Sequence, residues 1–164
     1  MYKVIAFDLF GTVLDASTVP HEEKLDYIRQ IQLPYWQPLK LPKTWKDIKP
    51  FEDSARGIER LRKYYKVVTC SNLPFEIQNS TLGKNGILFD RYILLEEYRV
   101  YKPKMVAYAA ILDQMQVEPR EVLFVTGNNS YDLTFPLKLG IMPMRIRDEG
   151  FTRNITDICL PEML

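Results

Sequence analysis

Polar residues that could do chemistry stand at four places along the chain. They are Asp8, Ser71 with Asn72, Lys102, and the run from Asn128 to Asp132. The only histidine, His21, stands among charged residues, and we expect it to be exposed. One histidine excludes a multi-histidine metal site and leaves little room for a Ser-His-Asp triad. Any chemistry therefore depends on carboxylates, hydroxyls, amides and lysines.

Each of these four sets follows a predicted strand or lies in the loop after one. Short runs of β-branched and aromatic residues predict strands at 3–9, 65–71, 92–95, 121–125 and 141–146. Apolar residues at helical spacing predict helices at 22–32, 51–65, 74–83, 103–115 and 131–139. This alternation predicts an α/β fold, a doubly wound parallel sheet with helices on both faces. Such sheets bind ligands at the carboxyl ends of their strands, where the four polar sets lie.

Length and composition predict the number of domains and exclude some classes of partner. The chain has 164 residues, and we expect one core domain over 1–164 with a short insert at 17–50. The net charge of +1 gives no electrostatic footprint for nucleic acid, and no apolar run approaches the roughly 20 residues that span a bilayer. An acid at Asp8 is unlike a signal peptide, and we expect Cys70 and Cys159 to be buried thiols. These features predict a cytoplasmic protein with neither nucleic acid nor membrane as partner.

The segment from Phe7 to Asp15 resembles the first motif of the haloacid dehalogenase-like superfamily. Three later motifs of that superfamily follow in order: a strand ending at Ser71, then Lys102-Pro103, then a strand and loop from Val122 to Asp132. The resemblance covers residues 3–146 and implies a Rossmann-like core and a hydrolase. It implies that Asp8 is a nucleophile forming a covalent aspartyl intermediate, and that Lys102 holds it ionised.

The resemblance also implies roles for the other polar residues. The implied catalytic set is Asp8, Lys102, Ser71 and Asp132, and the implied substrate-binding set is Thr12, Phe10, Asn72, Tyr108, Asn128 and Asn129. Ser71 and Thr12 would bind Asp8 or an anionic group of the substrate, although hydroxyls in such places also cap turns. Asn72 would help to bind a halide or carboxylate. Tyr108 has the spacing of an active-site tyrosine, but could equally be a core aromatic residue. Either Asn128 or Asn129 could be the functional amide of its loop.

Phe10 separates two subclasses of the superfamily. Phosphatases carry a general acid two positions after the nucleophile, where this chain has Phe10. Loss of that acid would slow departure of an alkoxide on the order of 10²–10⁴-fold, whereas a halide leaves without a proton. The sequence is therefore closest in form to the 2-haloacid dehalogenases. In that interpretation Asp8 displaces halide from a small haloacid, and water then hydrolyses the ester.

The fourth motif bears on a metal cofactor. Asn128 stands where the superfamily usually has an aspartate, which favours a reaction without a metal. Asp8 and Asp132 could still bind Mg²⁺ weakly. The alternative functions are thus a Mg²⁺-dependent phosphatase acting on activated or bulky phosphate esters, and a non-catalytic binding module with the same fold.

The insert at 17–50 is too short for the helical cap of the dehalogenases, which carries an arginine. Arg29 could replace that arginine or be solvated. Tyr35, Trp36 and Trp45 could cover the site or pack the insert onto the core. A reduced cap favours either a bulky substrate or closure by a second subunit in a homodimer. In all cases we expect a small anionic substrate, attracted by Lys102.

Overall fold

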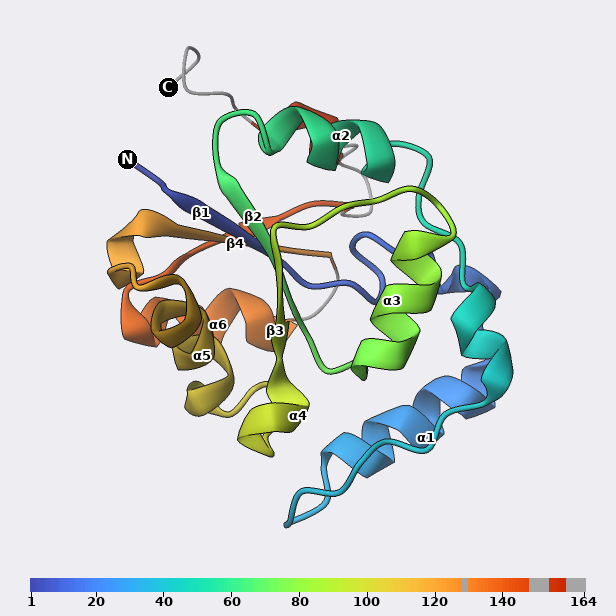
Figure 1. Ribbon diagram of the computed structural model, residues 1–164. Helices are drawn as coiled ribbons and strands as arrows, with labels where there is room; N and C mark the ends of the chain where they lie inside the picture. The colour runs from blue at the N-terminus through green and yellow to red at the C-terminus, as the bar shows by residue number, and fades with distance from the viewer. Residues whose placement is uncertain (128–129, 148–153, 159–164) are drawn as a thin grey trace.

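Five short strands form one parallel sheet in the order β3-β2-β1-β4-β5 (Figure 1). The computed structural model describes residues 1–127, 130–147 and 154–158. The strands are β1 (Val4–Phe7), β2 (Lys66–Ser71), β3 (Arg91–Leu94), β4 (Val122–Thr126) and β5 (Met142–Arg145). Every residue of β1 and β4 is buried, which explains why these strands are continuous apolar runs. The predicted α/β parallel sheet is confirmed.

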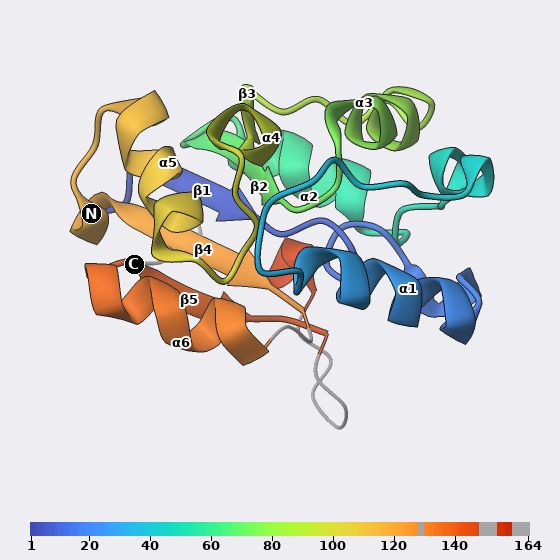
Figure 2. The ribbon, with the colours of Figure 1, turned by 90° about the horizontal axis from the view of Figure 1, so that it is seen from below.

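Helices cover both faces of the sheet, as Figure 2 shows. α2 (Ser54–Leu61) and α3 (Phe75–Gly83) pack on the face to which Ile5 and Phe7 point. α5 (Met105–Met115) and α6 (Ser130–Leu139) pack on the face of Val4 and Ala6. This alternation along β1 follows from the two-residue period of a strand. It produces the two apolar layers of a doubly wound fold.

The segment 17–50 contains one long helix, α1 (His21–Ile31). Short 3₁₀ turns flank it, η1 (Ala16–Thr18) and η2 (Lys43–Asp47), and the proline-rich stretch between α1 and η2 has no regular structure, as predicted. Figure 1 shows α1 lying beyond the carboxyl end of β1. Tyr27 of α1 and Trp45 of η2 are buried in the core, so the segment packs onto the domain.

Several elements differ from the prediction in extent. Helix α2 is shorter than the predicted 51–65, and a single helical turn, α4 (Leu95–Tyr98), follows β3 directly. Two further 3₁₀ turns are η3 (Pro119–Glu121) and η4 (Ile155–Asp157). In the described residues, no helix is long and apolar enough to cross a membrane. Cys70 is a buried free thiol, and Cys159 lies outside the described residues.

Candidate active site

Three predicted site residues from distant parts of the chain meet in one buried cluster. Asp8 directly follows β1, Lys102 lies between α4 and α5, and Asp132 is in the first turn of α6. The Nζ atom of Lys102 lies 2.9 Å from Oδ1 of Asp8 and 3.0 Å from Oδ2 of Asp132. The side chain of Lys102 is 1% exposed and that of Asp8 4% exposed. The charges of the ammonium group and the two carboxylates interact strongly, because these buried side chains have little contact with water.

The loop after β1 holds the second oxygen of Asp8. The carbonyl of Leu9 accepts hydrogen bonds from the N–H groups of Thr12, Val13 and Leu14, which closes a tight turn. The Thr12 hydroxyl donates to Oδ2 of Asp8 at 2.9 Å and accepts from the Gly127 N–H at 2.7 Å. Thr12 therefore links the ends of β1 and β4.

Glycine is required at two positions of this junction. Gly11 has a φ of +82°, a conformation that other residues rarely adopt. A Cβ atom at Gly127 would overlap the carbonyl oxygen of Gly11. The absence of a side chain at Gly127 is what lets the two loops approach closely enough for the hydrogen bond to Thr12.

Asp132 accepts hydrogen bonds on both of its oxygens. The Tyr108 hydroxyl donates to Oδ1 at 2.6 Å, and the Thr126 hydroxyl donates to Oδ2 at 3.1 Å, beside Lys102. Burial raises the pKa of Asp132, and Lys102 and Tyr108 counter part of that rise. Burial, followed by the charge of Asp132, raises the pKa of Tyr108 well above its usual range, so this phenol stays a donor. Asp132 with these partners fixes the position of the Lys102 ammonium group.

Lys102 is protonated despite its burial. Burial by itself lowers the pKa of Lys102, but the charges of Asp132 and Asp8 outweigh it and raise that pKa well above the ordinary value. The ring of Phe124 lies 5.2 Å from Nζ and adds a favourable contact for a cation.

The side chain of Asn72 holds the backbone of Lys102. Its Oδ1 accepts from the Lys102 N–H at 2.7 Å, and its Nδ2 donates to the Lys102 carbonyl at 3.3 Å. Ser71, the neighbouring residue, is buried, and its hydroxyl accepts from the Leu73 N–H at 3.1 Å. In the described residues Asn72 thus binds protein backbone on both sides, and Ser71 closes the turn after β2.

A pocket of about 400 Å³ opens beside this cluster. Its walls are Phe10, Lys102, Pro103 and Tyr131, together with Lys24, Tyr27, Ile28 and Ile31 of α1 and Gln32, which directly follows that helix. The residues from α1 are spaced by three, four and seven positions from Lys24, so they form one face of the helix. The lining is predominantly apolar, and α1 contributes four of its nine residues.

Two phenols of this pocket were not among the predicted site residues. Tyr27 is buried, and burial raises its pKa well above the usual range, with Tyr131 and Asp8 adding to the rise. The ammonium group of Lys102 and the Asn72 side chain act on the pKa of Tyr27 in the opposite direction. Burial likewise raises the pKa of Tyr131, which also interacts with Asp8 and Lys102. Both phenols therefore stay protonated beside Asp8.

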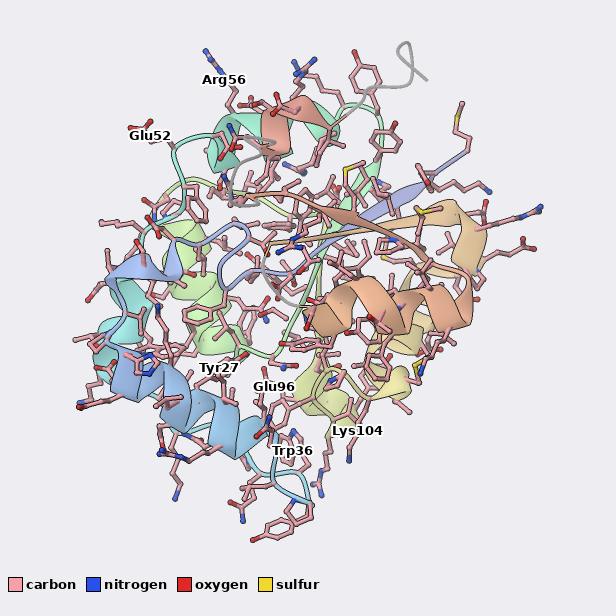
Figure 3. The ribbon with its side chains drawn as sticks, turned by 180° about the vertical axis from the view of Figure 1, so that it is seen from behind. Tyr27, Trp36, Glu52, Arg56, Glu96 and Lys104 are labelled. Carbon is pink, nitrogen blue, oxygen red and sulfur yellow. The ribbon has the colours of Figure 1, made fainter. Side chains whose placement is uncertain are left out.

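The aromatic residues of the insert have different positions. Phe10 stacks on Trp45 with ring centres 5.0 Å apart and meets the edge of Tyr27 at 5.6 Å. The Trp45 indole donates to Glu23 at 2.8 Å, so Trp45 packs the insert onto the core. Figure 3 shows Tyr27 on the side of α1 that faces the core and Trp36 near the carboxyl end of that helix. Arg29 and Tyr35 are exposed and do not line the pocket.

The groups that surround Asp8 and Asp132 do not fit a Mg²⁺ ion bound between the two carboxylates. The ammonium group of Lys102 stands between the two carboxylates, and Asp132 already accepts from three protein donors. In the described part of the chain, no group of three or more His, Cys, Asp or Glu could hold a metal ion. Asn128 and Asn129, the predicted amides of the fourth motif, lie outside the described residues. We therefore derive no step through a metal.

The sequence of this chain is similar to sequences of dehalogenases. The sequence is 28% identical over 114 residues to (S)-2-haloacid dehalogenase 4A of Burkholderia cepacia, which covers 68% of this chain. The chain spans only about half of that relative, 49% of its length. No family model matches.

Solved structures show the same fold at lower identity. A defluorinating L-2-haloacid dehalogenase superposes with a TM-score of 0.81 at 17% identity, over 96% of this chain and 93% of that one. The L-2-haloacid dehalogenase of Xanthobacter autotrophicus with chloropropionic acid covalently bound gives a TM-score of 0.71 at 21% identity, over 89% and 78% of the two chains. The predicted resemblance in fold and sequence is confirmed by these matches.

Proposed function

Because the chain has the haloacid dehalogenase-like fold and a sequence similar to 2-haloacid dehalogenases, we propose that it is a hydrolase that removes halide from a 2-haloacid. The observation that carries the proposal is the ion pair between Asp8 and Lys102 beside an apolar pocket. Lys102 keeps the carboxylate ionised, and the exclusion of water leaves it a stronger nucleophile than a hydrated carboxylate.

The first step is displacement at carbon. An oxygen of Asp8 forms a bond to C2 of the substrate as the carbon–halogen bond breaks, and halide leaves with the electron pair. No proton is required by the leaving group, which suits the apolar Phe10 two positions after Asp8. The hydrogen bond from Thr12 and the ion pair with Lys102 orient the two oxygens of Asp8 for the attack.

The second step regenerates the carboxylate. Water attacks the carbonyl carbon of the Asp8 ester, which releases the 2-hydroxy acid and one proton and restores Asp8. Displacement inverts C2, and hydrolysis at the carbonyl leaves C2 untouched. An (S)-2-haloacid therefore gives the (R)-2-hydroxy acid. In this proposal the segment 17–50 is a reduced cap, with α1 as the wall of the substrate pocket.

Halide release from (S)-2-chloropropionate in the presence of a metal chelator tests the proposal. We expect chloride and (R)-lactate in equal amounts, and no release by Asp8→Asn. Asp47→Asn, which changes an exposed carboxylate paired with Lys84, is the matched control and should keep full activity. A single turnover in ¹⁸O-water should place the label in the Asp8 carboxylate.

Two outcomes would contradict the proposal. Mg²⁺-dependent turnover of an aryl phosphate without halide release would identify a phosphatase. A folded protein that turns over neither substrate class across broad panels would identify a binding module.

A further inference from the structure

A second hollow adjoins the pocket near Asp8. That hollow, of about 280 Å³, shares Ile31, Gln32, Lys102 and Pro103 with the pocket, and Trp36 also lines it. The two neighbouring hollows together form an apolar trough, with Ile31 of α1 where they meet. Figure 3 places Trp36 near the carboxyl end of that helix, and Tyr27 on the core side of the same helix.

The middle of this trough is apolar and open to solvent. Ile28 lines the pocket and is 41% exposed, and Ile31 lies one turn further along the same face of α1. Leu25, on the same helix, is 37% exposed but does not line the pocket. A ligand with an apolar chain would remove Ile28 and Ile31 from water, which is favourable in proportion to the area buried.

The positions along α1 suggest how a substrate would lie. Lys24 precedes Tyr27 by about one helical turn, and Ile31 follows Tyr27 by about one turn, so Lys24 and Ile31 are about 10 Å apart along the axis. Tyr27 packs against Phe10, two positions after Asp8, so we place the reacting carbon near Tyr27. A carboxylate would therefore lie toward Lys24, and a substituent on the reacting carbon would extend toward Ile31.

We propose, resting on the function proposed above, that the preferred substrate is a 2-haloacid with an unbranched apolar chain of several carbons. The chain lies in the trough against Ile28 and Ile31. A volume of about 400 Å³ falls in the range of roughly 300–1,000 Å³ that encloses ligands much larger than a three-carbon acid. Small haloacids react at the same Asp8 but leave the trough empty.

Comparison of two chain lengths tests this substrate class. We expect kcat/KM for (S)-2-bromooctanoate to exceed that for (S)-2-bromopropionate at least about tenfold, because each buried methylene adds affinity. Ile28→Ser should reduce this ratio at least about threefold, whereas Leu25→Ser, an equally exposed residue of the same helix, should keep it. Equal values for the two substrates, or an unchanged ratio in Ile28→Ser, would overturn the proposal while leaving the dehalogenase function intact.

Binding of halogen-free acids separates the trough from the chemistry. Calorimetry should give at least about tenfold tighter binding of octanoate than of propionate to the unmodified protein, and Ile28→Ser should diminish that difference. If neither bromoacid releases halide but octanoate is preferred, the proposed function fails and the apolar trough stands. If octanoate and propionate bind equally, the trough does not select chain length and this inference is wrong.

Discussion

The ammonium group of Lys102 lies 2.9 Å from the carboxylate of Asp8, although 94 positions of sequence separate the two residues. The parallel pairing of β1 with β2 and β4 makes this possible, because it brings the loops after several strands to one edge of the sheet. Asn72 holds the backbone of Lys102. Tyr108 and Thr126 hold Asp132, the second carboxylate beside Lys102. Contacts from several elements of the fold therefore fix the position of the ion pair.

Removal of Lys102 should make stability depend on pH. In the unmodified protein the pKa of Lys102 is raised, so its contribution is fully present below about pH 10 and is lost only as the pH rises through the raised value. In Lys102→Met the buried carboxylates lose the ammonium group between them, and the pKa of Asp132, already raised by burial, rises further. A raised carboxyl pKa favours folding at low pH and disfavours it as the pH rises through that value.

Urea unfolding at pH 5.5 and pH 8 measures this effect. We expect Lys102→Met to lose about 3–5 kcal/mol at pH 8 and clearly less at pH 5.5. Lys84→Met, which removes an exposed partner of Asp47, should change stability by less than about 1 kcal/mol at both values. An equal loss for Lys102→Met at both pH values would mean that the carboxylates are not coupled to the lysine.

Asn72→Ala should impair the reaction through the position of Lys102. The variant removes both hydrogen bonds to the Lys102 backbone and leaves a buried N–H and carbonyl without these partners. We expect kcat to fall about 10- to 100-fold because the ammonium group moves relative to Asp8. KM should change less than kcat if Asn72 acts on Lys102 alone. Asn85→Ala, which removes one hydrogen bond to the Thr81 carbonyl, should leave both constants unchanged.

The sheet and the cluster could be predicted because their signals are local. β1 and β4 are short, fully buried runs, and Asp8 and Asp132 each lie within one turn or loop of one of them. The ends of α2 could not be predicted from local sequence patterns. The carboxylate of Asp53, the residue directly before that helix, accepts from Arg147 and from the Ile155 N–H, both at 2.6 Å. Those partners are about 100 positions away, so no local pattern reveals them.

The sequence likewise could not predict that the Tyr27 side chain faces the core. Helical spacing groups Tyr27 with Lys24, Ile28 and Ile31, but it does not say what that face contacts. Which residues this face contacts depends on the path of the proline-rich stretch after α1, which brings Trp45 against Phe10. The stacking of Trp45 on Phe10 is a tertiary contact between the insert and the loop after β1. The pocket is therefore a property of the packed insert, not of any one motif.

Gly127→Ala should damage both stability and activity. The added Cβ would overlap the Gly11 carbonyl oxygen, so the loops after β1 and β4 must separate. Separation breaks the hydrogen bond from the Gly127 N–H to Thr12, and Thr12 in turn orients Asp8. We expect a loss of about 1–3 kcal/mol in urea unfolding and a kcat reduced at least about tenfold.

Gly83→Ala is the matched control for that prediction. Gly83 lies at the end of α3, and a Cβ there would meet nothing within 4 Å. This variant should be as stable as the unmodified protein or slightly more so, because alanine restricts the unfolded chain. Normal activity in Gly127→Ala would show that the close approach of the two loops is not needed to orient Asp8.

Tyr108→Phe should weaken the anchoring of Asp132. The variant keeps the buried ring and its edge contact with Phe124 but removes the 2.6 Å hydrogen bond to Oδ1 of Asp132. We expect a loss of about 1–3 kcal/mol and a fall in kcat that exceeds any change in KM, since the Lys102 ammonium group loses a fixed partner. The raised pKa of Tyr108 keeps its proton on through neutral pH, and loss of its hydrogen bond raises the pKa of Asp132 further, so the loss of stability at pH 9 should be at least as large as at pH 6. Tyr98→Phe removes a 2.7 Å hydrogen bond to the exposed Asp113 and one accepted from Gln114, and should change neither stability nor kcat appreciably. A similar fall in kcat for both variants would show that the effect of Tyr108 is not transmitted through Asp132.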